Sequence, residues 1–363
     1  MNKLFTFGLS LLLGLASHAA LSADEPASLS AADRKAVIDV LATKLRANYV
    51  FPDVAERLAT TLIKKNAKGD YAASNNVASF AQALSQDLRE LGKDGHFRVN
   101  FDPDFRASSN EGNAVPSADE MARERQMLAR MAFGIQRVEQ MPGNVGYLEL
   151  RGFGPASVVS AAYTAALTLL QGSDALIIDL RRNGGGEPDS VAHFMSYFFA
   201  EGDRRHLNDL YFRPQNETQQ FWTEPSVTLR YNKLVYVLTA PRTFSAGEEC
   251  AYNFQTQKRA TLIGETTGGG ANPGEEFGLA HGLVAFIPTG RAINPITKTN
   301  WEHVGVIPDI KVTAADALQT AHVTALKQLL QNSSDAEQRE ALEFTLAKVE
   351  KGEVAKPVYQ MRQ

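Results

Sequence analysis

The sequence predicts an α/β protein with a helical segment at each end of its core. Three observations predict this class. Apolar residues at helical spacing dominate the chain after residue 30, strand-like and helical segments alternate after Gly134, and amphipathic helical patterns return from Asp316. Such alternation is typical of a sheet covered by helices. The 363 residues are enough to bury a large core.

The first 23 residues have the pattern of a secretory signal. Lys3 precedes an apolar run over residues 4–15, and Ser17-His18-Ala19 forms a small-x-small cleavage site. The run is too short to span a bilayer, and no later stretch approaches about 20 consecutive apolar residues. We therefore expect a periplasmic or secreted protein without a membrane span. The single cysteine, Cys250, can form no intramolecular disulfide.

Four segments follow the signal. We expect an N-terminal helical domain over 24–93, a strand, linker and candidate lid over 94–134, a core over 135–315 and C-terminal helices over 316–363. Helices are predicted from residue 31, from 52, over 77–91, near 119–131, over 156–171 and 188–199, and after Ser245. Strands are predicted at 97–101, 135–138, 145–150, 175–180, 234–240, 260–264, 282–288 and 304–306.

Charge and residue spacing exclude several classes of function. The net charge of -4 includes no basic cluster, so neither nucleic acid nor a membrane surface is an expected partner. The chain has no HExxH motif, no cysteine pair and no local run of metal ligands. We therefore expect no cofactor and no metal. Peptides, partly unfolded proteins or hydrophobic small molecules are the expected partners. The sequence does not indicate which oligomeric state the protein adopts.

Two segments indicate chemistry. The predicted strand 234–240 ends shortly before Ser245, and a helix follows, which places this serine on a strand-to-helix turn. There its hydroxyl can attack a carbonyl while the amide of Ala246 faces the developing oxyanion. A helix-capping role for Ser245 is the alternative. The strand 175–180 leads into Gly184-Gly185-Gly186, whose amides could hold an oxyanion or a phosphate, or could form a plain tight turn.

The motifs together resemble a known family. In order, they are Asp179-Leu180-Arg181-x-Asn183-x-Gly185-Gly186, Thr243-Phe244-Ser245-Ala246-Gly247-Glu248, Ile263-Gly264-Glu265-Thr266-Thr267-Gly268-Gly269-Gly270 and Gly305-Val306-x-Pro308-Asp309. They resemble the tail-specific or C-terminal processing serine peptidases. The segments 48–55 and 94–99 resemble the branch named after interphotoreceptor retinoid-binding protein. The resemblance implies a crotonase-like core of ββα units.

The chain departs from processing peptidases in two ways. Their general-base lysine is missing, because the segment after the nucleophile reads Gly268-Gly269-Gly270-Ala271, and Lys258 lies too far along the helix to replace it. The segment between Phe101 and Gly134 is too short for a PDZ domain. The tricorn protease core, a relative, uses a histidine and a glutamate at positions that match His96 and Glu302. The resemblance therefore implies a triad of Ser245, His96 and Glu302.

The resemblance also implies an oxyanion hole. We expect one donor from Ala246 and another from the glycine run, at Gly185 or Gly186. His303 and His281 are rival bases that a surface position explains better. Two other functions stay open. The scaffold could carry retinoids or fatty acids without proteolysis, as the retinoid-binding relatives do, or it could support a different hydrolase or acyl-transfer reaction.

Overall fold

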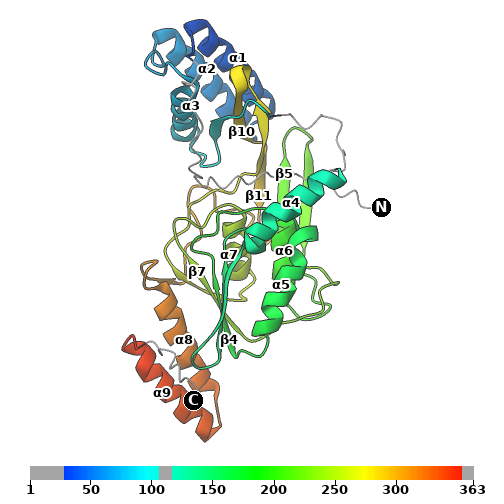
Figure 1. Cartoon of the computed structure of the whole chain (residues 1–363), viewed down its shortest axis with the longest axis vertical. Helices are drawn as coiled ribbons and strands as arrows, with labels where there is room; N and C mark the ends of the chain where they lie inside the picture. The colour runs from blue at the N-terminus through cyan, green and yellow to red at the C-terminus, as the bar shows by residue number, and fades with distance from the viewer. Residues whose placement is uncertain (1–27, 106–116, 354–363) are drawn as a thin grey trace, which may run out of the picture. The chain divides into compact units, whose positions relative to one another are not determined.

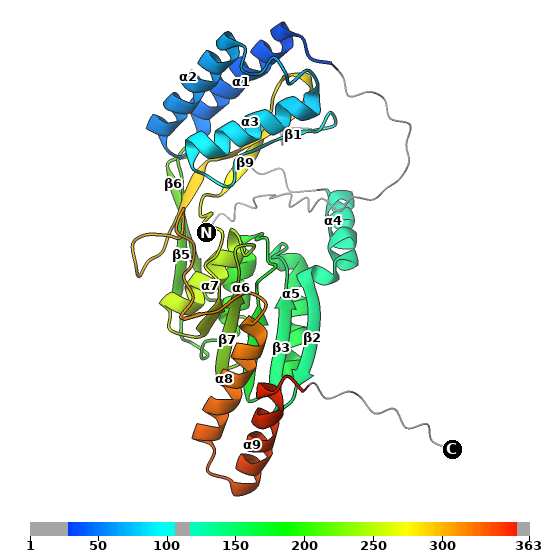
Figure 2. The same ribbon diagram turned by 90° about the vertical axis from the view of Figure 1, so that its left-hand side faces the viewer.

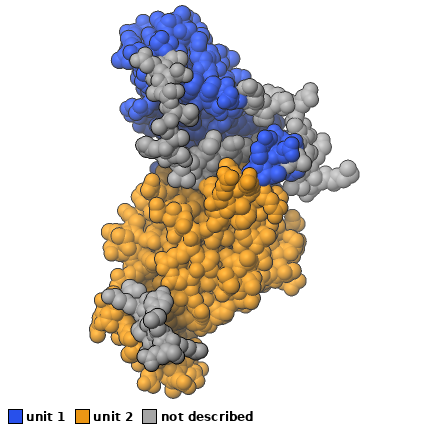
Figure 3. All heavy atoms as spheres, in the orientation of Figure 1, with its two compact units in different colours: residues 1–124, 206–221, 269–304 blue, residues 125–205, 222–268, 305–363 orange. Residues whose placement is uncertain are grey.

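A computed structural model describes residues 28–105 and 117–353. The predicted signal over 1–23 lies outside the described residues, as does the stretch 106–116 of the candidate lid. The chain divides into two compact units (Figure 3). Unit 1 contains residues 1–124, 206–221 and 269–304, and unit 2 contains residues 125–205, 222–268 and 305–363. The helix α4 (Ala118–Arg130) runs across the division between them.

The helices of unit 1 begin and end at capping residues. In α1 (Ala31–Asn48), Ser30 accepts a hydrogen bond from the Asp33 amide, and the Asp33 carboxylate accepts one from the Ser30 amide. Helix α2 (Pro52–Lys68) has proline at its first position and Gly69 in the left-handed conformation after its end. Asn76 caps α3 (Val77–Gly92). The three predicted helices of this segment are confirmed.

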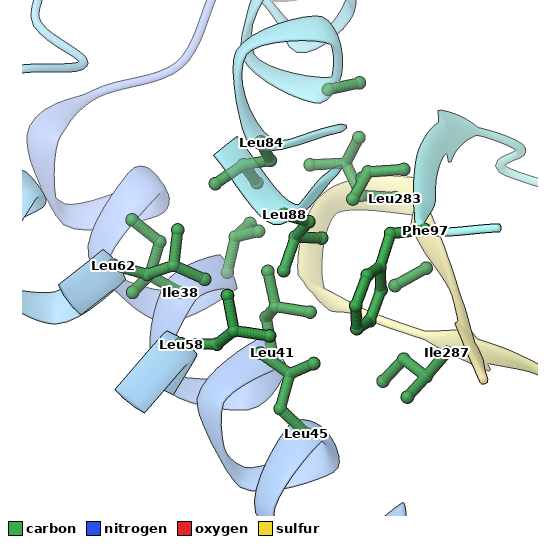
Figure 4. Close-up of a cluster of buried hydrophobic side chains, with 14 of the residues drawn as sticks. Ile38, Leu41, Leu45, Leu58, Leu62, Leu84, Leu88, Phe97, Leu283 and Ile287 are labelled. Atoms are coloured by element: carbon green, nitrogen blue, oxygen red, sulfur yellow. The ribbon is translucent and has the colours of Figure 1, made fainter. Parts of the chain in front are cut away.

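The core of unit 1 joins these helices to strands from much later in the chain. A three-stranded antiparallel sheet has the order β1 (Arg98–Phe101), β10 (Leu283–Pro288) and β9 (Gly274–Gly278). Leu283 and Ile287 of β10 pack into the same buried cluster as Leu84 and Leu41 of the helices (Figure 4). A second sheet has the order β11 (Gly290–Ile293), β5 (His206–Phe212) and β6 (Glu217–Trp222).

Unit 2 is built on a six-stranded sheet. Its order is β12 (Ile310–Lys311), β8 (Thr261–Gly264), β7 (Leu234–Thr239), β4 (Ala175–Asp179), β3 (Val145–Leu150) and β2 (Ile135–Met141). Only β2 pairs antiparallel; the other neighbours run parallel. The central strands are buried on both faces, as parallel strands between helical layers are. The carboxyl ends of β4 and β7 therefore lie side by side.

Helices complete the layers of unit 2. On one face of the sheet, Tyr147, Ile177 and Leu238 share a buried cluster with Ala321 of α8 (Ala317–Asn332) and Leu342 of α9 (Ala336–Glu350). Figure 2 shows α8 and α9 as an adjacent pair. The remaining helices are α5 (Ala156–Leu170), α6 (Pro188–Ser196) and α7 (Ala246–Thr256), which pack against one another in chain order (Figure 1).

The predicted α/β class, with helices at both ends of the described chain, is confirmed. A strand predicted at 304–306 is wrong, because His303 and Gly305 have φ angles of 65° and 68° and the chain turns there. A side chain at Gly305 would lie 2.4 Å from the Thr267 carbonyl oxygen. The sequence did not predict the strands β5, β6, β9, β11 and β12. The first four lack a clear apolar alternation, and β12 has only two residues. Within the described residues, no helix combines the length and apolarity needed to cross a membrane.

The N-terminal core gives a first testable prediction. Leu84 is fully buried on α3, whereas Leu91 on the same helix is 41% exposed. Leu84→Ala should lower the free energy of unfolding by about 2–5 kcal/mol, because it leaves a cavity. Leu91→Ala, the matched control, should change it by less than about 0.5 kcal/mol. Urea unfolding followed by circular dichroism measures both. Equal losses would show that α3 does not contribute its buried face to the core.

Candidate active site

The turn that carries Ser245 is fixed to the neighbouring strand end. Because β4 and β7 are parallel neighbours, the loops that follow them start at the same edge of the sheet. The buried Thr243 hydroxyl donates to the Leu180 carbonyl oxygen at 2.7 Å and accepts from the Ala240 amide at 3.1 Å. The Phe244 amide donates to the Asn183 carbonyl oxygen at 3.0 Å. The serine turn and the glycine run are thus one hydrogen-bonded structure.

Ser245 has a strained backbone conformation. Its φ of 53° and ψ of -124° lie in a region that residues with a side chain rarely adopt. Its carbonyl oxygen accepts the amides of Glu248 and Glu249 at 2.8 and 3.0 Å. Ser245 and Glu248 also form a capping box, so Ser245 is the N-cap residue of α7, and this position does not exclude a chemical role for its hydroxyl. A strained serine on a sharp strand-to-helix turn is the arrangement that exposes a nucleophile.

A buried carboxylate holds the backbone of this turn. Glu248 is fully buried, and its two oxygens accept the Ser245 amide at 3.0 Å and the Thr267 hydroxyl at 2.5 Å. The Thr267 hydroxyl in turn accepts the Val306 amide at 2.6 Å. The side chains of Glu248 and Thr267 therefore join three of the sequence motifs, those around Ser245, Thr267 and Val306.

The glycine run lies against Ser245. Gly185 has a φ of 106°, and a side chain there would lie 2.7 Å from the Ser245 Cβ and 3.1 Å from the Ala246 nitrogen. Gly186 has a φ of 138° and forms a bridge with Phe153, whose carbonyl oxygen would collide with any side chain. Both positions therefore require glycine. Gly184 has open space around it.

The amides of this region differ in whether they already have acceptors. Gly184 donates to the Arg151 carbonyl oxygen at 3.2 Å, and Gly185 donates to the Asn183 side-chain oxygen at 2.9 Å. Among the described residues, the amides of Gly186 and Ala246 have no acceptor. The N–H of Gly185 is thus already hydrogen-bonded to Asn183. The short distance between Gly185 and Ser245 reflects close packing of the two backbones and not a free donor.

The other two predicted catalytic residues, His96 and Glu302, belong to unit 1. His96 lies on the turn before β1, and Glu302 lies on the loop after β11. The structure brings them together with Asp94, so that one oxygen or nitrogen from each side chain lies within 4.8 Å of the others. The side chains of His96 and Glu302 are 9% and 8% exposed. The distant segments 94–96 and 302 therefore form one buried polar cluster.

Asp94 is the member of this cluster that sequence reasoning did not assign. Its side chain is fully buried, and its oxygens accept the His96 amide at 3.0 Å, the Asn272 amide group at 2.9 Å and the Tyr49 hydroxyl at 3.3 Å. Burial, together with the charges of Asp94 and Glu302, raises the pKa of Tyr49. In the sequence, the position of Asp94 two residues before His96 is the signal that could have indicated its role.

The cluster also bears on metal binding. An imidazole and two carboxylates at this spacing could hold a metal ion, although no local run of ligands predicted such a group. The carboxylate oxygens, however, already accept several donors. Asp94 accepts three, and one Glu302 oxygen accepts the Ala271 amide at 2.5 Å. These bonds are as expected of carboxylates that orient a histidine.

The rival groups lie in other surroundings. The His303 side chain is 55% exposed, and that of His281 is 39% exposed beside Asp33. Lys258 lies beyond the end of α7. The thiol of Cys250 is buried within α7, and burial raises its pKa well above the usual value, so it is a poor nucleophile.

The close approach at Gly185 gives a prediction. Gly185→Ala should lower the free energy of unfolding by about 2 kcal/mol or more, because the new methyl group meets the Ser245 Cβ and the backbone is strained. Gly184→Ala, one residue earlier, should change it by less than about 0.5 kcal/mol. Urea unfolding measures both, and equal effects would contradict the described packing.

The strained backbone of Ser245 gives another testable prediction. Ser245→Gly should be more stable than Ser245→Ala by about 1 kcal/mol, because glycine adopts the observed φ and ψ without a steric penalty. In an unstrained turn the order would be reversed, since glycine stabilises the unfolded chain. Unfolding of the two variants in urea distinguishes these cases.

Comparison with known proteins agrees with the resemblance. Residues 144–312 match the model of peptidase family S41, and residues 19–136 match the N-terminal domain of this family in eukaryotic IRBP. A carboxyl-terminal-processing protease of Synechocystis is 27% identical over 215 residues, which cover 59% of this chain and 48% of that protein. The chloroplastic carboxyl-terminal-processing peptidase 2 of Arabidopsis thaliana is 27% identical over 219 residues, covering 55% of this chain and 40% of that protein.

Solved structures share the fold. A candidate peptidase from Parabacteroides merdae has a TM-score of 0.56 at 19% identity, over 82% of this chain and 97% of that one. Mature CPAF complexed with lactacystin has a TM-score of 0.56 at 11% identity, over 89% and 99%. The chain spans less than half the length of the two curated relatives it matches. Since the two family models together match well over half of its residues, this chain belongs to peptidase family S41.

Proposed function

We propose that this chain is an exported serine peptidase that cleaves peptides or partly unfolded proteins. Ser245 is the nucleophile, His96 is the general base, and Glu302 is a carboxylate partner of the histidine. The observation that carries the proposal is the strained backbone of Ser245 beside the Ala246 amide, which has no acceptor among the described residues. Membership of a peptidase family supports the reaction class. The signal pattern of the first 23 residues supports export.

The proposed reaction follows from these roles. The Ser245 hydroxyl attacks the scissile carbonyl carbon as His96 takes its proton, because a serine is a weak nucleophile without a base. The tetrahedral intermediate collapses when His96 returns the proton to the leaving amine. Water then attacks the acyl-enzyme with His96 again as base, which releases the acid product and restores Ser245.

The proposed oxyanion donors are the amides of Ala246 and Gly186. Ala246 begins α7, so the helix dipole adds to its hydrogen bond. Gly186 is preferred to Gly185 as the second donor, because the Gly185 amide already donates to Asn183. Donors held by the fold need no reorganisation as negative charge develops, and each is worth about 3 kcal/mol of the barrier in comparable sites.

Two pockets of the structure bear on the carrier alternative. A retinoid or fatty acid needs a mainly apolar pocket. One pocket of about 780 Å³ in unit 2 is lined by groups such as Asp174, Lys233, Arg259 and Asp309. Another of about 520 Å³ in unit 1 is lined by Asp53, Glu56, Arg57, Lys64 and other mostly polar residues. Neither pocket has the mainly apolar lining that such a ligand needs, so neither supports carriage.

Covalent labelling tests the proposal. A fluorophosphonate probe should label the purified wild-type protein and should not label Ser245→Ala, because the probe needs the activated hydroxyl. His96→Ala should lose labelling and should reduce hydrolysis of a fluorogenic unfolded protein by about 10³-fold, as loss of a triad base does. His303→Ala, which removes the neighbouring rival base, is the matched control and should label like the wild type.

The outcomes separate the alternatives. Labelling and hydrolysis that survive in His96→Ala would remove this histidine as the base. Hydrolysis of a small ester without cleavage of any polypeptide would point to a different hydrolase. A wild-type protein that takes no label but binds retinol would point to a carrier.

A further inference from the structure

The geometry of unit 1 points to a residue beyond the proposed triad. We propose that Asp94 is a positioning residue that fixes the ring of His96, with the proton on Nδ1 and the lone pair on Nε2. This inference rests on the proposed role of His96 as a base. It adds to the Ser245, His96 and Glu302 triad a second carboxylate, two residues before the histidine in the chain.

Asp94 and His96 are held together by the turn they share. One Asp94 oxygen accepts the His96 backbone amide at 3.0 Å, and the same oxygen lies 3.7 Å from the His96 Nδ1 atom. That second distance is longer than a hydrogen bond but suits an electrostatic contact. Hydrogen bonds of catalytic groups are often long without substrate and tighten when it binds. A small ring rotation would make Nδ1–H a donor to Asp94.

The carboxylate of Asp94 is itself held in place. Its other oxygen accepts the Asn272 side-chain amide at 2.9 Å and the Tyr49 hydroxyl at 3.3 Å. Asp94 is 1% exposed, and the ring of His96 stacks on Phe286 with centroids 6.2 Å apart. A buried side chain whose two oxygens accept three hydrogen bonds has little freedom to move. It can therefore act as a fixed reference for the imidazole.

Glu302 is less suited to this task on its own. It comes from a distant loop, and one of its oxygens accepts the Ala271 amide at 2.5 Å. Its other oxygen lies 3.5 Å from Nδ1 of the exposed His303. Glu302 thus supplies negative charge near the imidazolium that forms during the reaction, while Asp94 determines which ring nitrogen carries the proton. A histidine in the wrong tautomer cannot accept the serine proton, and such errors cost orders of magnitude in rate.

The experiment uses ¹⁵N NMR of histidine-labelled full-length protein, which reports the tautomer of each imidazole. The spectra are recorded in a Ser245→Ala background with EDTA present, and the His96 signals are those that disappear in His96→Ala. We expect His96 to carry its proton on Nδ1. Asp94→Ala should move it to Nε2 or to a mixture, and in the Ser245 enzyme it should reduce kcat by about 10³-fold. Asp94→Asn, which can keep an acceptor but loses the charge, should keep the tautomer and lose about 10- to 100-fold in kcat.

Asp87→Ala is the matched control, because Asp87 is another buried carboxylate of unit 1. It accepts hydrogen bonds from Tyr71 at 2.5 Å and Lys65 at 2.7 Å. It should cost stability while leaving the His96 tautomer and kcat within about threefold of the wild type.

A wild-type tautomer and near-normal kcat in folded Asp94→Ala would overturn the inference. If Asp94→Ala does not fold, near-normal kcat in Asp94→Asn overturns it instead. A different result, an active His96→Ala variant, would contradict the proposed function. The tautomer assignment does not depend on activity, so the two failures are distinguishable.

Discussion

The turn around Ser245 depends on one buried carboxylate. Glu248 has no exposed surface, and a carboxyl group in such a place is tolerated only when its oxygens are hydrogen-bonded. The fold meets this requirement with the Ser245 amide and the Thr267 hydroxyl. The Thr267 hydroxyl also accepts a hydrogen bond from the Val306 amide. The hydrogen bonds that satisfy Glu248 therefore hold three segments of the chain together. The strained conformation of Ser245 persists because the surrounding bonds leave it no alternative.

Local signals made the general fold and the strand-to-helix turn at Ser245 predictable. Proline at the start of α2, asparagine before α3 and apolar residues at helical spacing identify helices by rules that act within a few residues. The strands β4 and β7 are continuous apolar runs, which buried parallel strands require. The glycines at 185 and 186 were recognisable because only glycine fits where two backbones approach so closely.

The parts that were not predictable depend on contacts between distant segments. The strands β5 and β9 have little apolar alternation, and they form because β11 and β10 present backbone partners to them. Asp94 could not be given a role, because its partners Tyr49 and Asn272 are brought to it only by the fold. The engagement of the Gly185 amide by Asn183 likewise appears only when the loop geometry is known.

The composition of unit 1 has a consequence for how the protein is made. Its buried cluster needs Leu283 and Ile287, which follow the helices by about 190 residues, so the chain must close a long loop before this core is complete. During synthesis, the apolar faces of α1, α2 and α3 therefore emerge well before their last partners. A fragment that ends before β10 would keep its apolar helix faces exposed, and we expect it to aggregate when produced alone.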